Sequence, residues 1–209
     1  MKKYKLNDIQ NQLIDVLKIG IEEFYTNDAE SLFSQEIAKG KDIDERAMVG
    51  CIYRYMYANL NNVCYPHIDI EYNRMQRLNK DEVDKSISLC STCRNEEMKK
   101  GGITCYEYAK TVREVMENVA SNEDEISMRP DIIIHRRNSG DNGLIVEFKK
   151  LGKTIKYDKA KVAYATCKFS PLHYKIGAVV QLGKKCATVY TYSDGKIVGE
   201  TRIGRNGGL

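Results

Sequence analysis

Three residues carry groups that could act together on a phosphate ester. Asp131 opens a β-branched run, and Glu147 and Lys149 lie in a second apolar run. Because side chains alternate along a strand, Glu147 and Lys149 share one face, and Asp131 can lie across from them on a neighbouring strand. Charged groups in such apolar strands should pair or bind a cation. The three residues therefore predict a site for metal-assisted hydrolysis of a phosphodiester.

The expected chemistry gives each group a role. Mg²⁺ is typically held by one or two protein carboxylates together with water and phosphate oxygens. Asp131 and Glu147 would supply the carboxylates, and the backbone carbonyl of Phe148 could add an oxygen ligand. The metal, Mg²⁺ or Mn²⁺, would polarise the phosphate and generate a hydroxide nucleophile. Lys149 would orient that water or stabilise the developing negative charge.

This pattern resembles the PD-(D/E)xK motif of the restriction-endonuclease-like nucleases. The sequence has Pro-Asp at 130–131, fifteen intervening residues, and then Glu-Phe-Lys at 147–149. The resemblance covers about residues 44–182 and implies a four-stranded mixed sheet flanked by helices. It implies a Mg²⁺-dependent nuclease acting on DNA, with RNA not excluded and with endonuclease or exonuclease action open. It also implies an upstream helical glutamate that helps to bind the metal, and Glu45 matches that position.

A closer similarity is to a poorly characterised bacterial family of PD-(D/E)xK proteins. Its pattern is found as ERA at 45–47, DIEYNR at 69–74, RPDIIIH at 129–135 and EFKK at 147–150. Glu71 could join the metal ligands, since four carboxylates would suit two metals, or it could pair with Arg74. By analogy, restriction or defence against foreign DNA is the context suggested.

The cysteines form a separate candidate site. Cys90 and Cys93 form a CxxC motif that is followed by Cys105, and Cys64 or a histidine could complete a tetrahedral zinc site. An iron–sulfur cluster, which some nucleases of the superfamily carry, is an alternative. The other alternative is a set of reduced thiols. An odd number of cysteines, seven, and the lack of an export signal in this sequence favour a reducing, cytoplasmic location.

Charge divides unevenly along the chain. The net charge is +4, but residues 149–209 hold thirteen basic and three acidic residues, a balance of +10, so that residues 1–148 carry −6. Basic side chains supply the sequence-independent part of nucleic-acid affinity. We therefore expect the lysines that follow Lys149, including Lys168 and Lys175, to cluster where Asp131 and Glu147 meet; the alternative is a solvated surface. The candidates for nucleic-acid contacts are Lys150, Lys156, Lys159, Lys161, Arg74 and Arg136.

Periodicity and turn signals predict the elements that position these residues. Helices are expected at 9–24 after the cap residue Asn7, at 29–37, at 44–60 after the cap residue Asp44, at 106–119 and at 158–168. Strands are expected at 66–72, 131–135, 144–150, 176–182, 186–192 and 196–201. The order indicates an α/β fold with a mixed central sheet.

The chain is expected to form one nuclease-like domain over residues 1–209. N-terminal helices would occupy 1–40, and an insertion at 75–125 would contain the loop from Cys90 to Cys105 and one helix. No apolar run is long enough for a membrane span, and a homodimer is one of the oligomeric states left open. Two other readings compete with the nuclease: a non-catalytic nucleic-acid-binding or assembly protein of the same fold, and a zinc-stapled interaction module.

Overall fold

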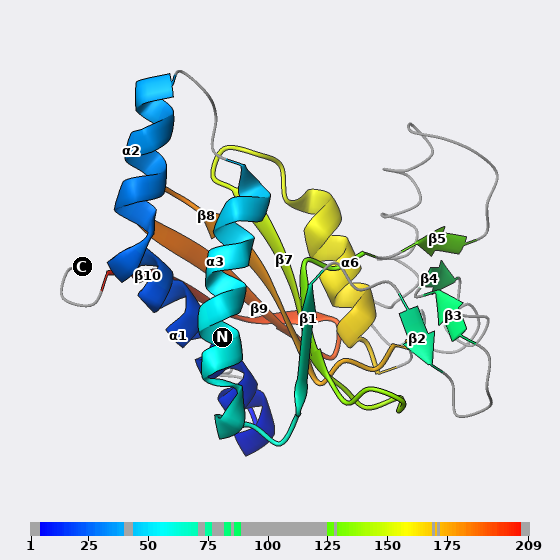
Figure 1. Cartoon of the computed structure of the whole chain (residues 1–209). Helices are drawn as coiled ribbons and strands as arrows, with labels where there is room; N and C mark the ends of the chain where they lie inside the picture. The colour runs from blue at the N-terminus through cyan, green and yellow to red at the C-terminus, as the bar shows by residue number, and fades with distance from the viewer. Residues whose placement is uncertain are drawn as a thin grey trace.

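A mixed six-stranded sheet flanked by helices forms the core of the protein (Figure 1), which confirms the expected α/β class. The computed structural model describes residues 5–39, 44–70, 74–76, 82–84, 86–88, 125–127, 129–168, 170 and 172–205. Side chains are described in these ranges except at 35–39 and in the short strands between 74 and 127. In chain order the core elements are α1 (Asp8–Asn27), α2 (Ala29–Lys39), α3 (Glu45–Ala58), β1 (His67–Ile70), β6 (Ile132–His135), β7 (Asn142–Lys150), α6 (Lys156–Thr166), β8 (Ile176–Leu182), β9 (Cys186–Ser193) and β10 (Lys196–Gly204).

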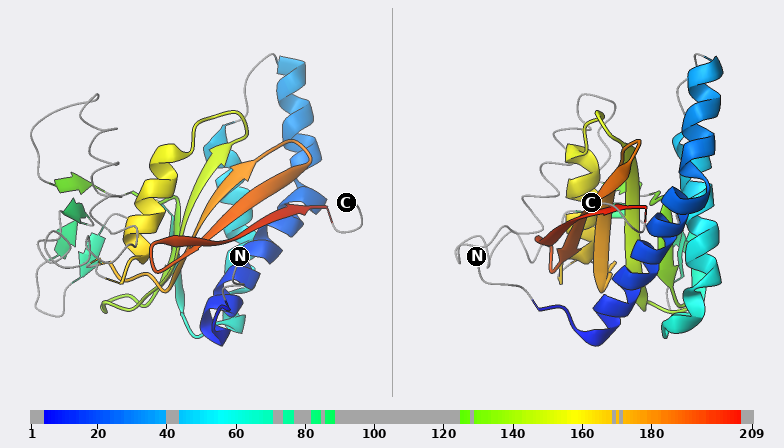
Figure 2. Two further views of the ribbon diagram at one scale, coloured as in Figure 1. Left: turned by 180° about the vertical axis from the view of Figure 1, so that it is seen from behind. Right: turned by 90° about the vertical axis from the view of Figure 1, so that its left-hand side faces the viewer.

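The strands are arranged in the order β1-β6-β7-β8-β9-β10. All neighbouring pairs are antiparallel except β7 and β8, which run parallel and are connected through α6. A parallel pair needs such a crossover, because a tight turn can only reverse the chain. The right-hand view of Figure 2 shows α1, α2 and α3 on one side of the sheet and α6 on the other.

The two main N-terminal helices begin where short polar residues cap them. Asn7 accepts a hydrogen bond from the backbone N–H of Gln10, whose side chain accepts one in return from the N–H of Asn7. Asp44 likewise accepts from the backbone N–H of Arg46 at the start of α3. These bonds satisfy N–H groups that have no partner within a helix. Both predicted start positions are confirmed.

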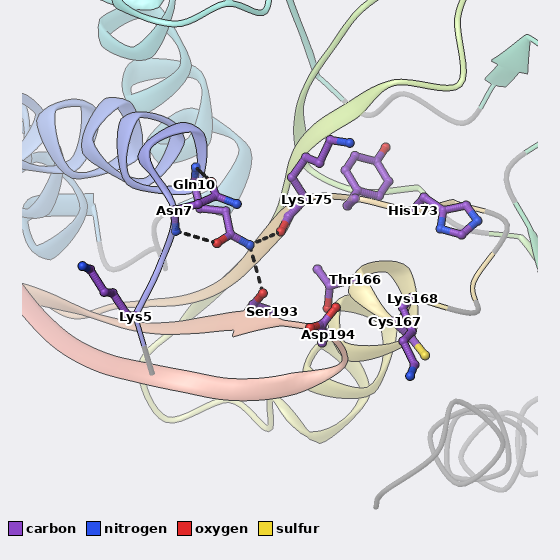
Figure 3. A pocket seen from close by; sticks show the side chains of 11 residues that line it. Lys5, Asn7, Gln10, Thr166, Cys167, Lys168, His173, Lys175, Ser193 and Asp194 are labelled. Carbon is purple, nitrogen blue, oxygen red and sulfur yellow. Dashed lines mark hydrogen bonds between the residues drawn. The ribbon is translucent and has the colours of Figure 1, made fainter. Parts of the chain in front are cut away.

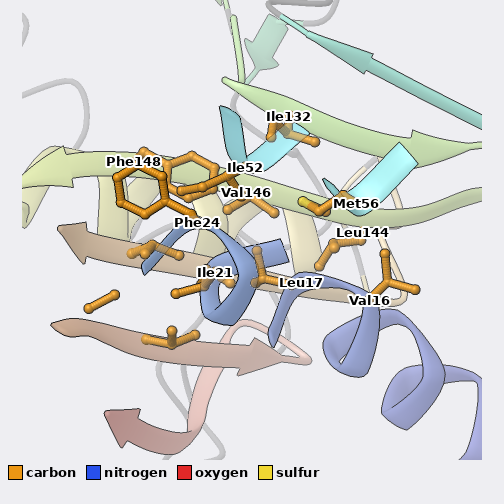
Figure 4. Close-up of a cluster of buried hydrophobic side chains, with 14 of the residues drawn as sticks. Val16, Leu17, Ile21, Phe24, Ile52, Met56, Ile132, Leu144, Val146 and Phe148 are labelled. Atoms are coloured by element: carbon orange, nitrogen blue, oxygen red, sulfur yellow. The ribbon is translucent and has the colours of Figure 1, made fainter. Parts of the chain in front are cut away.

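Apolar residues fill the space between α1, α3 and the sheet (Figure 4). Phe24 of α1, Ile52 of α3 and Phe148 of β7 are all fully buried in this cluster. A second cluster lies between the opposite face of the sheet and α6. Residues 142–148 of β7 are therefore buried on both faces, as expected for a central strand with a parallel neighbour.

Four short strands form two small ladders outside this core. They are β2 (Arg74–Gln76) with β3 (Glu82–Asp84), and β4 (Ser86–Ser88) with β5 (Glu125–Ser127). A 3₁₀ turn, η1 (Leu60–Asn62), follows α3. Most of the expected insertion at 75–125, including the predicted helix at 106–119, lies outside the described residues. Among the described helices, none has the length and apolar character needed to cross a membrane.

Two glycines of the helical layer differ in how closely other residues pack against them. A Cβ added to Gly20 of α1 would lie 2.5 Å from Met56 Cγ and 3.2 Å from the carbonyl oxygen of Ile52. The close packing of α1 on α3 thus depends on the absence of a side chain at this position. A Cβ added to Gly50 of α3 would meet no atom of another described element within 4 Å.

We predict opposite effects on stability for the two Gly→Ala substitutions. Gly20→Ala should lower the free energy of unfolding by about 1–3 kcal/mol, because it overpacks the interface between two helices. Gly50→Ala should raise it by roughly 0.5–1 kcal/mol, because alanine suits a helix interior better than glycine. Urea unfolding of both variants tests this. Equal stabilities of the two variants would contradict the packing of α1 on α3.

Candidate active site

The hairpin of β6 and β7 brings together the three residues singled out in the sequence. Ile132 pairs with Val146, which places Asp131 beside the end of β7 that carries Glu147. The backbone N–H of Phe148 donates a hydrogen bond of 2.6 Å to Asp131 Oδ2. Phe148 packs into the core on the side of α1 and α3, whereas Glu147 faces α6. The alternation predicted for β7 thus holds at the site.

Glu147 is a buried carboxylate that pairs with a buried lysine. Its side chain is about 4% exposed, and its Oε1 forms an ion pair with Lys161 Nζ of α6, whose side chain is 7% exposed. That oxygen has no partner with the geometry of an ordinary hydrogen bond among the described residues. Burial, and to a smaller extent the nearby Asp131 carboxylate, raise the pKa of Glu147 to about 8, whereas Lys161 acts to lower it.

Glu45 reaches the same end of β7 from the first turn of α3. Its Oε1 accepts a hydrogen bond of 3.2 Å from Lys149 Nζ, and its Oε2 accepts one of 3.0 Å from the backbone N–H of Lys150. Burial alone would lower the pKa of Lys149, but the carboxylates of Asp158 and Glu45 outweigh it and raise this pKa. Lys149 therefore stays an ammonium group at neutral pH.

Asp158, in the first turn of α6, is a member of the cluster that the sequence did not reveal. It is 4% exposed, and burial raises its pKa while Lys149 and Lys161 oppose that shift. The only local signal is its position three residues before Lys161, which places both on one face of α6. α6 can approach the sheet because a Cβ at Gly177 of β8 would lie 2.5 Å from Val162 Cγ1.

The resulting cluster holds four carboxylates and two ammonium groups. Burial also raises the pKa of Asp131, although the Phe148 N–H bond and the two lysines oppose it. An excess of negative charge in a partly buried place favours the uptake of protons or of a cation. The carboxylates are Glu45, Asp131, Glu147 and Asp158, and the ammonium groups are Lys149 and Lys161.

The oxygen donors of Asp131 and Glu147 fit a hard divalent cation. Within the described ranges, no group of three His, Cys, Asp or Glu side chains is arranged to hold a metal ion. Mg²⁺ usually takes only one or two protein carboxylates and completes its shell with water and phosphate oxygens. Glu147 Oε1 is the oxygen that pairs with Lys161, so a metal at this carboxyl would have to share or replace that ion pair. Asp131 and Glu147 are the residues that would hold such an ion.

The other predicted site residues fall into two groups. Glu71, Cys90, Cys93 and Cys105 lie outside the described residues, as does the side chain of Arg74. Cys64 is described, and it is an exposed free thiol. The structure therefore gives no geometry for the zinc site expected from the cysteines or for the role of Glu71.

The candidate nucleic-acid contacts do not form one surface. Lys161 is buried against Glu147, so that its ammonium belongs to the cluster rather than to an exposed basic face. Lys159, two residues away, lies over the ring of Tyr190 instead. Arg136 follows the far end of β6, where it contacts Asp141 and the carbonyl of Cys64. Lys150 and the exposed Lys156 lie near the carboxyl end of β7 and the start of α6.

Lys168 and Lys175 line a different cavity, of about 430 Å³, at the other end of α6 (Figure 3). About 15 Å of helix separates the two ends of α6. Lys175 also lies 3.6 Å from Asp141. The expectation that the lysines cluster beside Asp131 and Glu147 is therefore wrong for Lys168 and Lys175. The basic residues of this part of the chain lie at both ends of α6, and only one of these ends adjoins Asp131 and Glu147.

The raised pKa of Glu147 predicts a fold that loses stability as pH rises. In the unfolded chain this carboxyl releases its proton near its ordinary pKa of 4.5, whereas in the folded chain it does so near 8. Between roughly pH 5 and 8 the unfolded state binds fewer protons, so that the free energy of unfolding falls with pH. Glu147→Gln should flatten this slope in metal-free buffer.

Urea unfolding midpoints measured over this pH range test the assignment. The matched control is Glu200→Gln, which alters an exposed carboxyl on β10 and should leave the slope as it is in the wild type. A slope that persists in Glu147→Gln would mean that Glu147 is not the buried group responsible.

The chain matches no protein-family model, no curated protein and no solved structure.

Proposed function

We propose that the protein is a Mg²⁺-dependent nuclease of the PD-(D/E)xK type that hydrolyses phosphodiester bonds in DNA. The observation that carries this proposal is the meeting of Glu45, Asp131, Glu147 and Lys149 at one end of β7. These residues come from three separate segments of the chain, and all match the motif in type and order. A mixed sheet with helices on both faces suits a restriction-endonuclease-like core.

Asp131 and Glu147 would hold the metal, and Glu45 would assist from α3. A bound Mg²⁺ supplies Lewis-acid polarisation of the phosphate and lowers the pKa of a bound water. The hydrolysis forms a bond between the water oxygen and phosphorus and breaks the bond between phosphorus and the leaving oxygen. Lys149, kept charged and held by Glu45, is placed to stabilise the negative charge that develops on the phosphate oxygens.

Lys161 and Asp158 support this arrangement from α6. Lys161 balances the buried charge of Glu147, and Asp158 in turn favours the charged state of Lys149. Lys150 and Lys156 are the nearby candidates for contacts with the nucleic-acid backbone, where each basic group neutralises about one phosphate charge. Restriction or defence against foreign DNA is the context that fits such an activity.

One observation favours a second candidate, a binding or assembly protein with the same fold. The ion pair of Glu147 with Lys161 already neutralises the deepest carboxylate without a metal. A protein that uses this pair only to hold α6 on the sheet would not need a cation. The two candidates differ in metal binding, because a nuclease of this kind must bind a divalent ion at Asp131 and Glu147.

Calorimetric titration with Mn²⁺ separates the two candidates. The nuclease should bind Mn²⁺, and Asp131→Asn should weaken binding by about 10–100-fold, in the range found for weakened metal sites. Glu200→Gln, which is remote from the cluster, should bind as the wild type does. Equal affinities in the wild type and Asp131→Asn would favour the binding or assembly protein.

Cleavage of plasmid and linear DNA in Mg²⁺ or Mn²⁺ tests the reaction itself. Asp131→Asn and Lys149→Ala should each reduce the rate by at least about 10²-fold, since the first removes the charge of a proposed metal ligand and the second removes the ammonium beside the reacting phosphate. Asparagine keeps an oxygen that can accept the Phe148 N–H, so that the hairpin should be preserved. Cleavage at wild-type rates by either variant would exclude this site as the catalytic one.

A further inference from the structure

A cavity of about 230 Å³ adjoins the cluster at the end of β7. Its walls come from the first two turns of α3, from the end of β1 and from the residue before β6. Two of the wall residues, Glu45 and Asp131, also belong to the cluster, so a molecule in this cavity would touch the proposed catalytic carboxylates. The residues that line it are Glu45, Arg46, Val49, Gly50, Ile70 and Asp131.

Gly50 of α3 lines this cavity, and the described residues leave room beside it. A glycine inside a helix makes the helix less stable than an alanine would. At Gly20 the close contact of α1 with α3 explains why a glycine is present. Among the residues that the structure describes, no such contact is found at Gly50, because a Cβ there would meet no atom of another element within 4 Å. The described neighbours thus leave space in front of Gly50, and this space belongs to the cavity.

The lining of the cavity combines apolar and charged groups. Ile70 is a large apolar residue that is 42% exposed at the end of β1, and Val49 lies near it on the wall. Arg46 is the one basic residue among the six lining residues, beside the two acidic ones, Glu45 and Asp131. A nucleotide presents matching parts, since its base and sugar offer apolar surface and its phosphate offers negative charge.

The size of the cavity restricts the form of the nucleic acid. Its volume is smaller than the roughly 300–1,000 Å³ of pockets that enclose drug-sized ligands. A cavity of this volume has room for one base but not for a base pair. A base can enter such a pocket only after it has left the helical stack, and this costs least in a strand that is already single.

We propose that this cavity receives one unpaired nucleotide next to the scissile phosphate, so that single-stranded DNA is the preferred substrate. The inference rests on the proposed nuclease function for the position of the phosphate. Gly50 is then a specificity-determining residue, because the size of its side chain decides whether the base can enter.

Binding of a short fluorescein-labelled DNA strand, alone or annealed to its complement, tests the pocket. The measurement uses fluorescence anisotropy in Ca²⁺ buffer, which supplies a hard cation. Gly50→Leu should weaken binding of the single strand by about tenfold, a typical loss for one base contact. It should leave binding of the duplex unchanged, and Gly50→Ala should have a smaller effect. The matched control is Ala58→Leu, at an exposed position of the same helix outside the cavity.

Three results would exclude the pocket. Gly50→Leu could bind the single strand as the wild type does, its affinity for both forms of DNA could fall equally, or the wild type could fail to bind the single strand.

Cleavage of the same DNAs in Mn²⁺ separates this inference from the nuclease proposal. Single-strand binding that depends on Gly50 without any cleavage would support the pocket and contradict the nuclease. Equal cleavage of both forms by the wild type and Gly50→Leu would support the nuclease and contradict the pocket.

Discussion

Burial of the Glu147 carboxylate in the layer between the sheet and α6 is the constraint on which the rest of the site depends. A carboxylate without a partner in such a place would be strongly unfavourable. Lys161 is the partner of this carboxylate, and it lies close enough because α6 connects the parallel strands β7 and β8 across the sheet. The fold and the charge cluster are therefore coupled: the helix that completes the parallel pair also brings the counter-ion.

The remaining charged groups follow from the same constraint. One ammonium does not balance the buried carboxylate of Glu147 and the half-buried carboxylate of Asp131, and burial raises the pKa of both. Lys149 lies on the exposed side of this cluster and is tied to Glu45, which links the start of α3 to the end of β7. A divalent cation bound at such a site would favour the ionised carboxylates, because it adds positive charge beside them. The affinity of the site for a metal and the protonation of its carboxylates should therefore be linked.

Features determined by nearby residues could be predicted from the sequence. The caps Asn7 and Asp44 act on N–H groups two or three residues away, and the face shared by Glu147 and Lys149 follows from strand alternation. The β6–β7 hairpin, with Asp131 beside Glu147, was predictable because a single turn joins the two strands. These local rules account for most of the core elements and for the centre of the candidate site.

Features that depend on how α6 packs could not be predicted in this way. The hydrophobic pattern of α6 is weak because Asp158, Lys161 and Thr166 are all buried in it, so its orientation on the sheet is not encoded as an apolar stripe. This explains why Lys161 was expected at a phosphate and Asp158 was not expected at all. Likewise, the cavity in front of Gly50 arises only when α3, β1 and Asp131 meet.

Anomalous diffraction from crystals soaked in Mn²⁺ shows whether the carboxylates at the end of β7 form a metal site. We expect an anomalous peak within about 2.5 Å of oxygens from both Asp131 and Glu147, with Lys161 displaced from Glu147 or sharing it with the ion. Crystals that show no peak there, while the ion pair of Glu147 and Lys161 stays intact at saturating Mn²⁺, would contradict the proposed metal site.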